Sequence, residues 1–429
     1  MNDRSMPTST NPLPQPIIQT AEGQFIFHGI TPEEAEECKR LYEEGGLQAL
    51  NKYFEEKRDQ WKTIPLNIGI IGNSGTGKSS FINAIRGLIG KDKGAAKVGV
   101  TETTTEPTPY AHPNNEQLKF WDLPGVGTPN FPREEYLEKI LFDRYDFFLI
   151  ISSARFTDND KWLANEIVQK EKQFFFVRTK IDIDIQNDKY NYQDAHNEKA
   201  VLTKIKDDIR QKLETLYDDR KVFLIDNHKR DMYDFNKLEQ RIIEDFPSLK
   251  REALILSLST LSEDMVRKKA QTLRKYLWGC CFASGAIGLI PIPGTSIVAD
   301  SIIIVKQSKF YFQQFGLDEE SLNRTAMMTS CDVTILKELV DGSIKDLLTW
   351  KGVIAFARAI PLVVLAIAVE EGFHLLPIIG WIISGTTSFG TTYAILNEIL
   401  KKMEEVAVKV VQAAIKNSAN QPRNNDSEN

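Results

Sequence analysis

Hydrophobic positions are sparse at the start of the chain and become regularly spaced further on, which divides the sequence into segments. Residues 1–24 are rich in Pro, Ser, Thr and Asn and have little to bury, so we expect disorder there. Residues 25–63 follow a helical pattern that begins near Pro32 and should break at Gly45-Gly46.

Short apolar runs separated by amphipathic stretches fill residues 64–248. We expect buried strands at the apolar runs, because strands covered on both faces read as continuous apolar sequence. The alternation with amphipathic stretches, such as 136–141 and 201–216, predicts an α/β domain with a mostly parallel sheet. The predicted strands are residues 66–71, 119–121, 147–151, 174–177 and 222–225.

Helical periodicity dominates residues 249–418, with Gly/Pro breaks at residues 290–294 and around Pro377. The polar residues 419–429 form a second segment that we expect to be disordered. The pattern therefore predicts an α/β domain between two helical parts of the chain.

Three segments of the C-terminal half are candidates for contact with a membrane. Residues 276–299 and 372–396 contain no Asp, Glu, Lys or Arg, but Gly and Pro interrupt both. Residues 395–415 form an amphipathic helix that either packs on its own domain or lies on a membrane. Buried core and membrane contact both remain open for these segments. The apolar face of the last helix consists of Leu396, Ile399, Leu400, Met403, Ala407, Val410 and Ala414, with Lys401, Lys402, Lys409 and Lys416 near the opposite side.

Composition narrows the class of protein. A chain of 429 residues exceeds what one hydrophobic core usually serves, and the net charge of −6 gives no reason to expect nucleic acid as the main partner. The mean hydropathy of −0.29 argues against many membrane spans. We expect a cytoplasmic protein with reduced thiols, because its four cysteines lack metal-ligand or disulfide-framework spacing. We expect no secretory signal, because the first residues lack a charged region followed by an apolar one.

A phosphate-binding loop follows the first predicted strand of the α/β domain. It has the pattern G-x-x-x-x-G-K-[ST], and backbone N–H groups of such a loop surround phosphate oxygens at the positive end of the next helix. We expect Lys78 to reach the β- and γ-phosphates and the Ser79 hydroxyl to ligate Mg²⁺. The expected nucleotide contacts are Gly72, Asn73, Ser74, Gly75, Thr76, Gly77, Lys78, Ser79 and Ser80.

A second motif, Asp122-Leu123-Pro124-Gly125, comes directly after a short predicted strand. An aspartate at a strand end beside such a loop is placed to hold the metal through water. Gly125 can offer its N–H to the γ-phosphate because no side chain blocks the approach.

The choice of base is predicted by Thr179-Lys180-Ile181-Asp182, again at a strand end. The Asp182 carboxylate can accept from N1–H and from the N2 amino group of guanine, a donor pair that adenine lacks. The stem of Lys180 can lie along the base, and Asn227 is a further candidate for closing the base pocket. These motifs predict binding of GTP and GDP with Mg²⁺.

A threonine-rich loop, residues 100–105, lies between the first two motifs. One of its threonines should complete the Mg²⁺ shell when a γ-phosphate is present and release it after hydrolysis. Composition does not say which of the four threonines does so.

Taken together, the chain resembles the immunity-related (interferon-inducible) GTPases, a dynamin-like group, over roughly residues 32–330. The resemblance implies a Ras-like P-loop GTPase domain inserted into an all-α helical domain assembled from both chain ends, which would comprise residues 25–63 and 249–418. The stretches that carry it are Gly94-Ala95-Ala96, Pro109-Tyr110-Ala111-His112-Pro113, Phe120 to Gly125, Tyr136-Leu137-Glu138-Lys139, Tyr145-Asp146-Phe147-Phe148 and Phe176 to Lys180.

The resemblance also implies functional roles. It places Thr104 at the switch threonine, which joins Ser79 and Asp122 at the metal, and Glu102 at a glutamate involved in hydrolysis across a dimer. Together with Lys78, these are the expected catalytic residues. Two GTPase domains would meet over their nucleotides to form a homo-oligomer, with Arg155 and Asn187 at interface positions. The family further implies action in cell-autonomous immunity, peripherally on intracellular or vacuolar membranes.

Three residues depart from related patterns. Val126 follows Gly125 where small Ras-like GTPases carry a water-orienting glutamine, so an isolated monomer should hydrolyse GTP slowly. This leaves open an alternative, a GTP-gated scaffold that binds nucleotide with little turnover. Val98 and Asp226 replace a threonine and a serine found in some members, without removing a nucleotide-contacting group.

Overall fold

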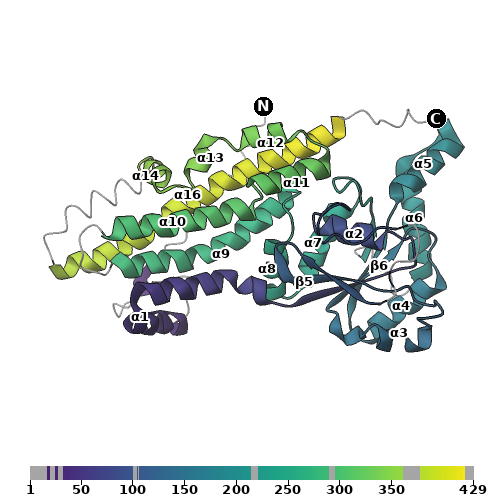
Figure 1. Ribbon diagram of the computed structural model, residues 1–429, viewed down its shortest axis with the longest axis horizontal. Coiled ribbons are helices and arrows are strands. Elements are labelled where there is room, and N and C mark those ends of the chain that lie inside the picture. The colour runs from purple at the N-terminus through teal and green to yellow at the C-terminus, as the bar shows by residue number, and fades with distance from the viewer. Residues whose placement is uncertain are drawn as a thin grey trace, which may run out of the picture. The chain divides into compact units, whose positions relative to one another are not determined.

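The computed structural model describes residues 17–19, 25–27, 32–99, 104, 106–213, 221–288, 295–360 and 377–420. These residues divide into two compact units. One contains the described residues of 1–58, 273–311 and 342–402, and the other those of 59–272, 312–341 and 403–429. The sheet and its flanking helices lie in the second unit (Figure 1).

A six-stranded sheet forms the centre of the second unit, in the order β4-β5-β3-β6-β7-β8. All neighbouring strands run parallel except β4, which pairs antiparallel with β5. The sheet thus confirms the predicted α/β fold, a Ras-like P-loop core with a mostly parallel sheet. The strands are β3 (Leu66–Ile71), β4 (Thr108–His112), β5 (Asn115–Asp122), β6 (Phe147–Ser152), β7 (Gln173–Arg178) and β8 (Val222–Leu224).

Helices cover both faces of this sheet. One face packs against side chains of α3, α4 and α6, and Figure 1 shows α2 and α7 on the other side. The central strands β6 and β7 are buried almost throughout, which explains why they read as uninterrupted apolar runs. The helices are α2 (Lys78–Ile85), α3 (Arg133–Lys139), α4 (Asp158–Gln169), α5 (Ile181–Tyr192), α6 (Glu198–Leu213) and α7 (Phe235–Asp245).

Helices make up most of the remaining chain, as expected. The first, α1, is kinked at Gly46, whose φ of 61° fits the break expected there. Residues 289–294, which include the whole of the first Gly/Pro break, and residues 361–376 lie outside the described residues. The helices are α1 (Pro32–Asp59), α8 (Ser248–Ser257), α9 (Glu263–Gly288), α10 (Thr295–Gln314), α11 (Glu319–Thr329), α12 (Val333–Leu339), α13 (Gly342–Asp346), α14 (Trp350–Ala357) and α16 (Pro377–Asn420).

Four elements differ from the expectation. Strand β4 was not predicted, because Pro109 and its half-buried neighbours give an edge strand no apolar run. Strands β1 (Ile17–Gln19) and β2 (Phe25–Phe27) form an antiparallel pair, so part of the segment expected to be disordered is a strand. Helix α16 begins at Pro377, well before residue 395. A proline is compatible with this start, because the first turn of a helix tolerates it.

The last helix has its apolar face inside the protein. All seven residues of the predicted face are buried, while Lys401, Lys409 and Lys416 are exposed. This agrees with core packing, one of the two alternatives for that helix. Among the described residues, none of the helices combines the length and the apolarity needed to cross a bilayer.

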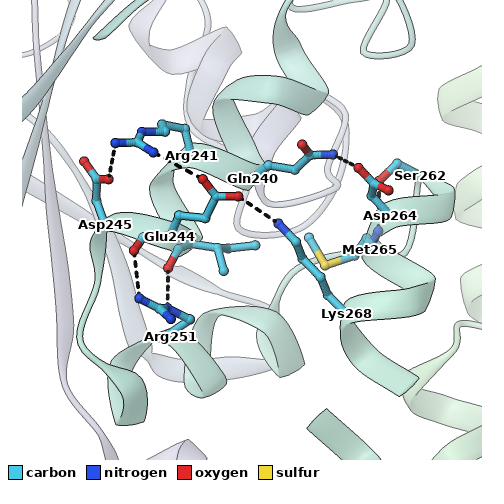
Figure 2. A network of polar contacts seen from close by, with 10 residues as sticks. Gln240, Arg241, Glu244, Asp245, Arg251, Ser262, Asp264, Met265 and Lys268 are labelled. Carbon is cyan, nitrogen blue, oxygen red and sulfur yellow. Dashed lines mark hydrogen bonds and ion pairs between the residues drawn. The ribbon is translucent and has the colours of Figure 1, made fainter. Parts of the chain in front are cut away.

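A polar network joins α7 to the start of α9 (Figure 2). Lys268 pairs with Glu244 at 3.7 Å, and Gln240 donates to Asp264. Arg251 of α8 donates to the carbonyl of Glu244 at 2.8 Å. Because Glu244 is about half exposed, each contact should contribute little alone.

Candidate functional site

The loop between β3 and α2 has a backbone that glycine makes possible. Gly75 and Gly77 have φ of 75° and 87°, a left-handed conformation that L side chains rarely adopt. At Gly72 a Cβ atom would lie 2.1 Å from the carbonyl oxygen of Ile151 in β6, so this position has no room for a side chain. The tip of the loop, Asn73 and Ser74, is exposed.

Lys78 lies over this loop rather than in solvent. Its Nζ donates to the carbonyl oxygens of Gly72 at 2.9 Å and Asn73 at 3.2 Å, and the residue is buried. The ammonium group therefore lies against two carbonyl oxygens of the loop. Phosphate oxygens would be stronger, charged acceptors for it.

Two hydroxyls converge on one carboxylate oxygen beside the loop. Ser79, at the start of α2, donates to Asp122 Oδ2 at 2.9 Å, and Thr104 donates to the same oxygen at 3.1 Å. Burial raises the pKa of Asp122, whereas the charge of Lys78 and these two hydrogen bonds act in the opposite direction. The structure thus brings together the three residues that were expected at the metal.

The donor set fits Mg²⁺, which prefers hard oxygen ligands and keeps several waters. Asp122 Oδ1 is buried and accepts no hydrogen bond from the described residues, and a metal-bound water would satisfy it. In the described part of the chain, no cluster of three or more His, Cys, Asp or Glu side chains could hold a metal by itself. A metal bound here would take its remaining ligands from water and phosphate.

The base-reading segment is tied directly to the phosphate loop. Thr179 Oγ1 donates to the carbonyl of Thr76 at 2.6 Å, and Asn227 Nδ2 donates to that of Gly77 at 3.1 Å. Both bonds connect loops that follow the carboxyl ends of β3, β7 and β8. They fix the distance between the loop that would grip phosphates and the loop that would read the base.

Asp182 lies in the first turn of α5 and is half-buried, and Lys180 before it has a left-handed φ of 58° and is exposed. The neighbouring Asp226 is buried, which raises its pKa, and the charge of Asp182 raises it further. Asp226 accepts from the His228 N–H at 2.8 Å, so its side chain is turned toward its own loop. Asp182 thus remains the carboxylate available to a base.

Gly125 is buried against the phosphate loop, where a Cβ atom would lie 3.5 Å from Asn73 Cα. Ser80 is half-buried in α2, and Arg155 and Asn187 are exposed. Of the threonine-rich loop, Thr104 is described. Glu102 and the other threonines, Thr101, Thr103 and Thr105, lie outside the described residues.

The motifs missed two side chains that hold the segment around Gly125. Tyr136 donates to the carbonyl of Pro124 at 2.7 Å, and Asn159 Nδ2 donates to that of Val126 at 3.0 Å. The sequence placed Tyr136 in an amphipathic stretch and in one of the stretches that carry the family resemblance, and neither gave it a role at the site. The capping residues Thr157 and Asp160 could have shown that a helix starts there, but not that Asn159 reaches another loop.

Comparison with known proteins yields a consistent group of sequences. A family model described as interferon-inducible GTPase (IIGP) matches residues 31–349. Interferon-inducible GTPase 5 of Rattus norvegicus is 33% identical over 384 residues, covering 89% of this chain and 82% of that protein. Interferon-inducible GTPase 1 of Mus musculus is 37% identical over 297 residues, covering 69% of this chain and 72% of that protein.

Solved structures are more distant. Toc33 from Arabidopsis thaliana, in complex with GDP and Mg²⁺, is 18% identical with a TM-score of 0.30 and covers 43% of this chain and 79% of that chain. A chain of an oligomerised bacterial dynamin pair is 11% identical with a TM-score of 0.30 and covers 90% of this chain and 76% of that chain. Neither likeness is close enough to bear on function.

Proposed function

The chain belongs to the interferon-inducible GTPase family, and we propose that it hydrolyses Mg·GTP to GDP and phosphate at the site built around Asp122. The observation that carries this proposal is the convergence of Ser79 and Thr104 on one oxygen of Asp122, next to the buried Lys78. These are groups that Mg²⁺ and a γ-phosphate require, and they lie within hydrogen-bonding distance of one another or of the loop.

In the proposed reaction, a water oxygen attacks the γ-phosphorus and the bond to the β–γ bridging oxygen breaks. GDP leaves with that oxygen, and the proton of the water passes to the phosphate released. When bound, Mg²⁺ would neutralise charge on the β- and γ-oxygens. Lys78 would donate to phosphate oxygens, the Gly125 N–H would bind the γ-phosphate, and Asp182 would select guanine.

Val126 supports a need for a second subunit. Its side chain is buried in the core of the sheet domain, so it is turned away from solvent and cannot orient water. We propose that GTPase domains associate over their nucleotides and that Glu102 assists hydrolysis there, with the exposed Arg155 and Asn187 at the contact. The same valine favours the second candidate function, a GTP-gated scaffold with little turnover.

One assay separates these candidates. Phosphate release from Mg·GTP is measured at increasing protein concentration, with ATP as the control nucleotide. Specific activity that climbs with concentration supports hydrolysis assisted by self-association. A rate near zero at every concentration, with tight binding of a GTP analogue, supports the scaffold. Failure to bind guanine nucleotides in Mg²⁺ would refute both.

We further propose that the protein acts in the cytoplasm at intracellular or vacuolar membranes, in cell-autonomous immunity. Since the apolar face of the last helix is buried, its exposed lysines are the groups there that could meet anionic lipid. Flotation with anionic liposomes, with GDP or a GTP analogue bound, tests this. The charge-reversed variant Lys409→Glu/Lys416→Glu should float less, and equal flotation would exclude that surface.

A further inference from the structure

We propose that Tyr136 is a positioning residue that aims the Gly125 N–H at the γ-phosphate, with Asn159 supporting the next part of the same segment. This inference rests on the hydrolysis proposed above. It assigns the orientation of a backbone donor to a side chain that none of the nucleotide-binding motifs contains.

The Tyr136 hydroxyl controls the peptide that carries the Gly125 N–H. It donates to the carbonyl oxygen of Pro124 at 2.7 Å. Because a trans peptide is planar, its C=O and N–H point in opposite directions. A hydrogen bond that fixes the Pro124 carbonyl on one side therefore fixes the Gly125 N–H on the other.

The Tyr136 hydroxyl remains a hydrogen-bond donor. Its side chain is fully buried, and burial raises the pKa of the phenol well above its usual range. The hydroxyl thus keeps its proton at physiological pH. The ring packs edge-on against Trp162 of α4 and against Phe131, with centroids 6.3 Å apart in both pairs. The hydroxyl is consequently held by a packed ring rather than by a mobile side chain.

The peptides after Gly125 are also held. Thr128 Oγ1 donates to the Gly125 carbonyl at 3.3 Å, and Asn159 Nδ2 donates to the Val126 carbonyl at 3.0 Å. The Gly127 N–H donates to the carbonyl of Phe131 at 2.8 Å. Gly127 has a φ of 80°, and a Cβ atom there would lie 2.7 Å from Asn159 Nδ2. Three successive peptides, 124–125, 125–126 and 126–127, are therefore each fixed by a side chain.

Asn159 is itself rigidly placed. Its Oδ1 accepts from Arg133 Nε at 2.7 Å, and the helix that carries it begins with a capping box between Thr157 and Asp160. Arg133 in turn lies over the ring of Trp162, 5.8 Å from its centroid. Arg133 at the start of α3 thus holds Asn159 at the start of α4, which in turn binds the Val126 carbonyl.

Position matters here because Val126 supplies no polar side chain. The alignment of the γ-phosphate then depends on the backbone of this segment, and small displacements of such a group cost catalysis steeply. Tyr136 contacts this segment at the Pro124 carbonyl, whereas Gly125 contacts the phosphate loop at Asn73. Loss of Tyr136 should therefore affect the response to a γ-phosphate more than the binding of GDP.

The test uses Tyr136→Phe, which removes the hydroxyl and keeps the ring. Its matched control is Tyr145→Phe, because Tyr145 is equally buried and also donates to a carbonyl, that of Ile140 at 2.8 Å. Unfolding, GDP affinity, affinity for a non-hydrolysable GTP analogue, kcat and KM are measured for the full chain. We expect kcat of Tyr136→Phe to fall about tenfold to a hundredfold, with GDP affinity within about threefold of the parent.

Tyr145→Phe should lose a similar amount of stability and keep its kcat within about twofold, since both variants leave one buried carbonyl unpaired. If Tyr136→Phe matches Tyr145→Phe in kcat and in the ratio of analogue to GDP affinity, the inference is wrong. If Tyr136→Phe does not fold, Asn159→Ala is measured in its place, with Asn165→Ala on the same helix as the control. Asn159→Ala should then lower kcat and the affinity ratio, and parent values would overturn the inference.

The affinity ratio keeps this test separate from the proposed function. A parent protein that binds nucleotide but releases no phosphate refutes hydrolysis alone. In that case a Tyr136→Phe variant that still distinguishes the GTP analogue from GDP as the parent does refutes the positioning role. A ratio that falls toward one supports that role without turnover.

Discussion

The hydroxyl of Ser79 lies 2.9 Å from Asp122 Oδ2, although 43 residues separate them in the sequence. Ser79 lies in the first turn of α2 and Asp122 ends β5, which pairs with β3 in parallel so that Ile70 and Asp122 are register partners. Because parallel strands end at the same edge of a sheet, both motifs are delivered to one place. The sheet register, rather than either motif, creates the contact.

This contact predicts how metal dependence changes when the hydroxyl is removed. In Ser79→Ala, Asp122 loses one of its two donors and Mg²⁺ loses a ligand. We expect the Mg²⁺ concentration needed for half-maximal GTP binding to rise about tenfold or more. Titration of nucleotide binding against Mg²⁺ measures it. Thr203→Ala, which removes a surface hydroxyl bonded to the Lys199 carbonyl, is the control. An unchanged requirement in Ser79→Ala would mean that the hydroxyl is no metal ligand.

Asp182→Asn should change the preferred base. The amide can still accept from N1–H, but its NH₂ group now faces the N2 amino group of guanine, so donor meets donor. Xanthine carries an acceptor oxygen at that position and fits the amide. We expect GDP affinity to fall about a hundredfold or more, and xanthosine diphosphate to bind better than to the parent.

Competition titrations with both nucleotides measure this exchange. Asp184→Asn is the matched control on the same helix, because the Asp184 carboxylate pairs with Arg178 at 2.7 Å instead of facing a base. If Asp182→Asn binds GDP as the parent does, another group reads guanine.

Two glycine-to-alanine variants should have opposite consequences. At Gly125 an added Cβ meets its nearest atoms at 3.5 Å, which is ordinary contact, so the fold and GDP binding should persist. The response to a γ-phosphate should be lost, because the methyl group stands beside the N–H that would bind it. At Gly72 the Cβ would lie 2.1 Å from the Ile151 carbonyl, and we expect a loss of more than about 2 kcal/mol of stability.

Chemical denaturation and titration with GDP and a non-hydrolysable GTP analogue distinguish these outcomes. The prediction fails if Gly125→Ala unfolds as easily as Gly72→Ala. It also fails if Gly125→Ala separates the analogue from GDP as well as the parent does.

Local patterns predicted the sheet where burial on both faces imposes an apolar run. Strand β3 has the predicted bounds, and β6 and β7 extend the predicted runs by one residue at one end or at both. The pattern failed at β4, which is an edge strand with a proline. It also made β5 too short, because the residues before the predicted run include two exposed polar side chains, Glu116 and Gln117. Sequence thus shows a strand only to the extent that both of its faces are covered.

At the site too, some features could be predicted from the sequence and others could not. The motifs located Lys78, Asp122 and Asp182, since the chemistry of each depends on neighbours along the chain. The hydrogen bonds between segments could not be predicted from the spacing of residues along the chain, because they depend on strand register and packing. The bond from Thr179 to the Thr76 carbonyl and the bond from Tyr136 to the Pro124 carbonyl belong to this second kind.

A buried histidine predicts the acid sensitivity of the sheet domain. His112, at the end of β4, is 1% exposed, and its Nδ1 accepts from the Asn114 N–H at 3.2 Å. That bond requires a neutral ring with its proton on Nε2. Burial lowers the pKa of His112 from 6.5 to about 3, helped by four cationic side chains. These cations are Lys269, Arg86, Arg230 and Arg324.

Between pH 6.5 and about 3 the unfolded chain therefore binds a proton at His112 that the folded protein does not bind. Stability falls as the pH drops through this window, by up to about 1.4 kcal/mol per pH unit from this residue. His112→Gln keeps an acceptor and does not titrate, so its free energy of unfolding should depend less on pH there. Denaturant unfolding at several pH values measures both slopes, with His228→Gln as the control at an exposed histidine. Equal slopes for His112→Gln and the parent would show that acid destabilises the fold through other groups.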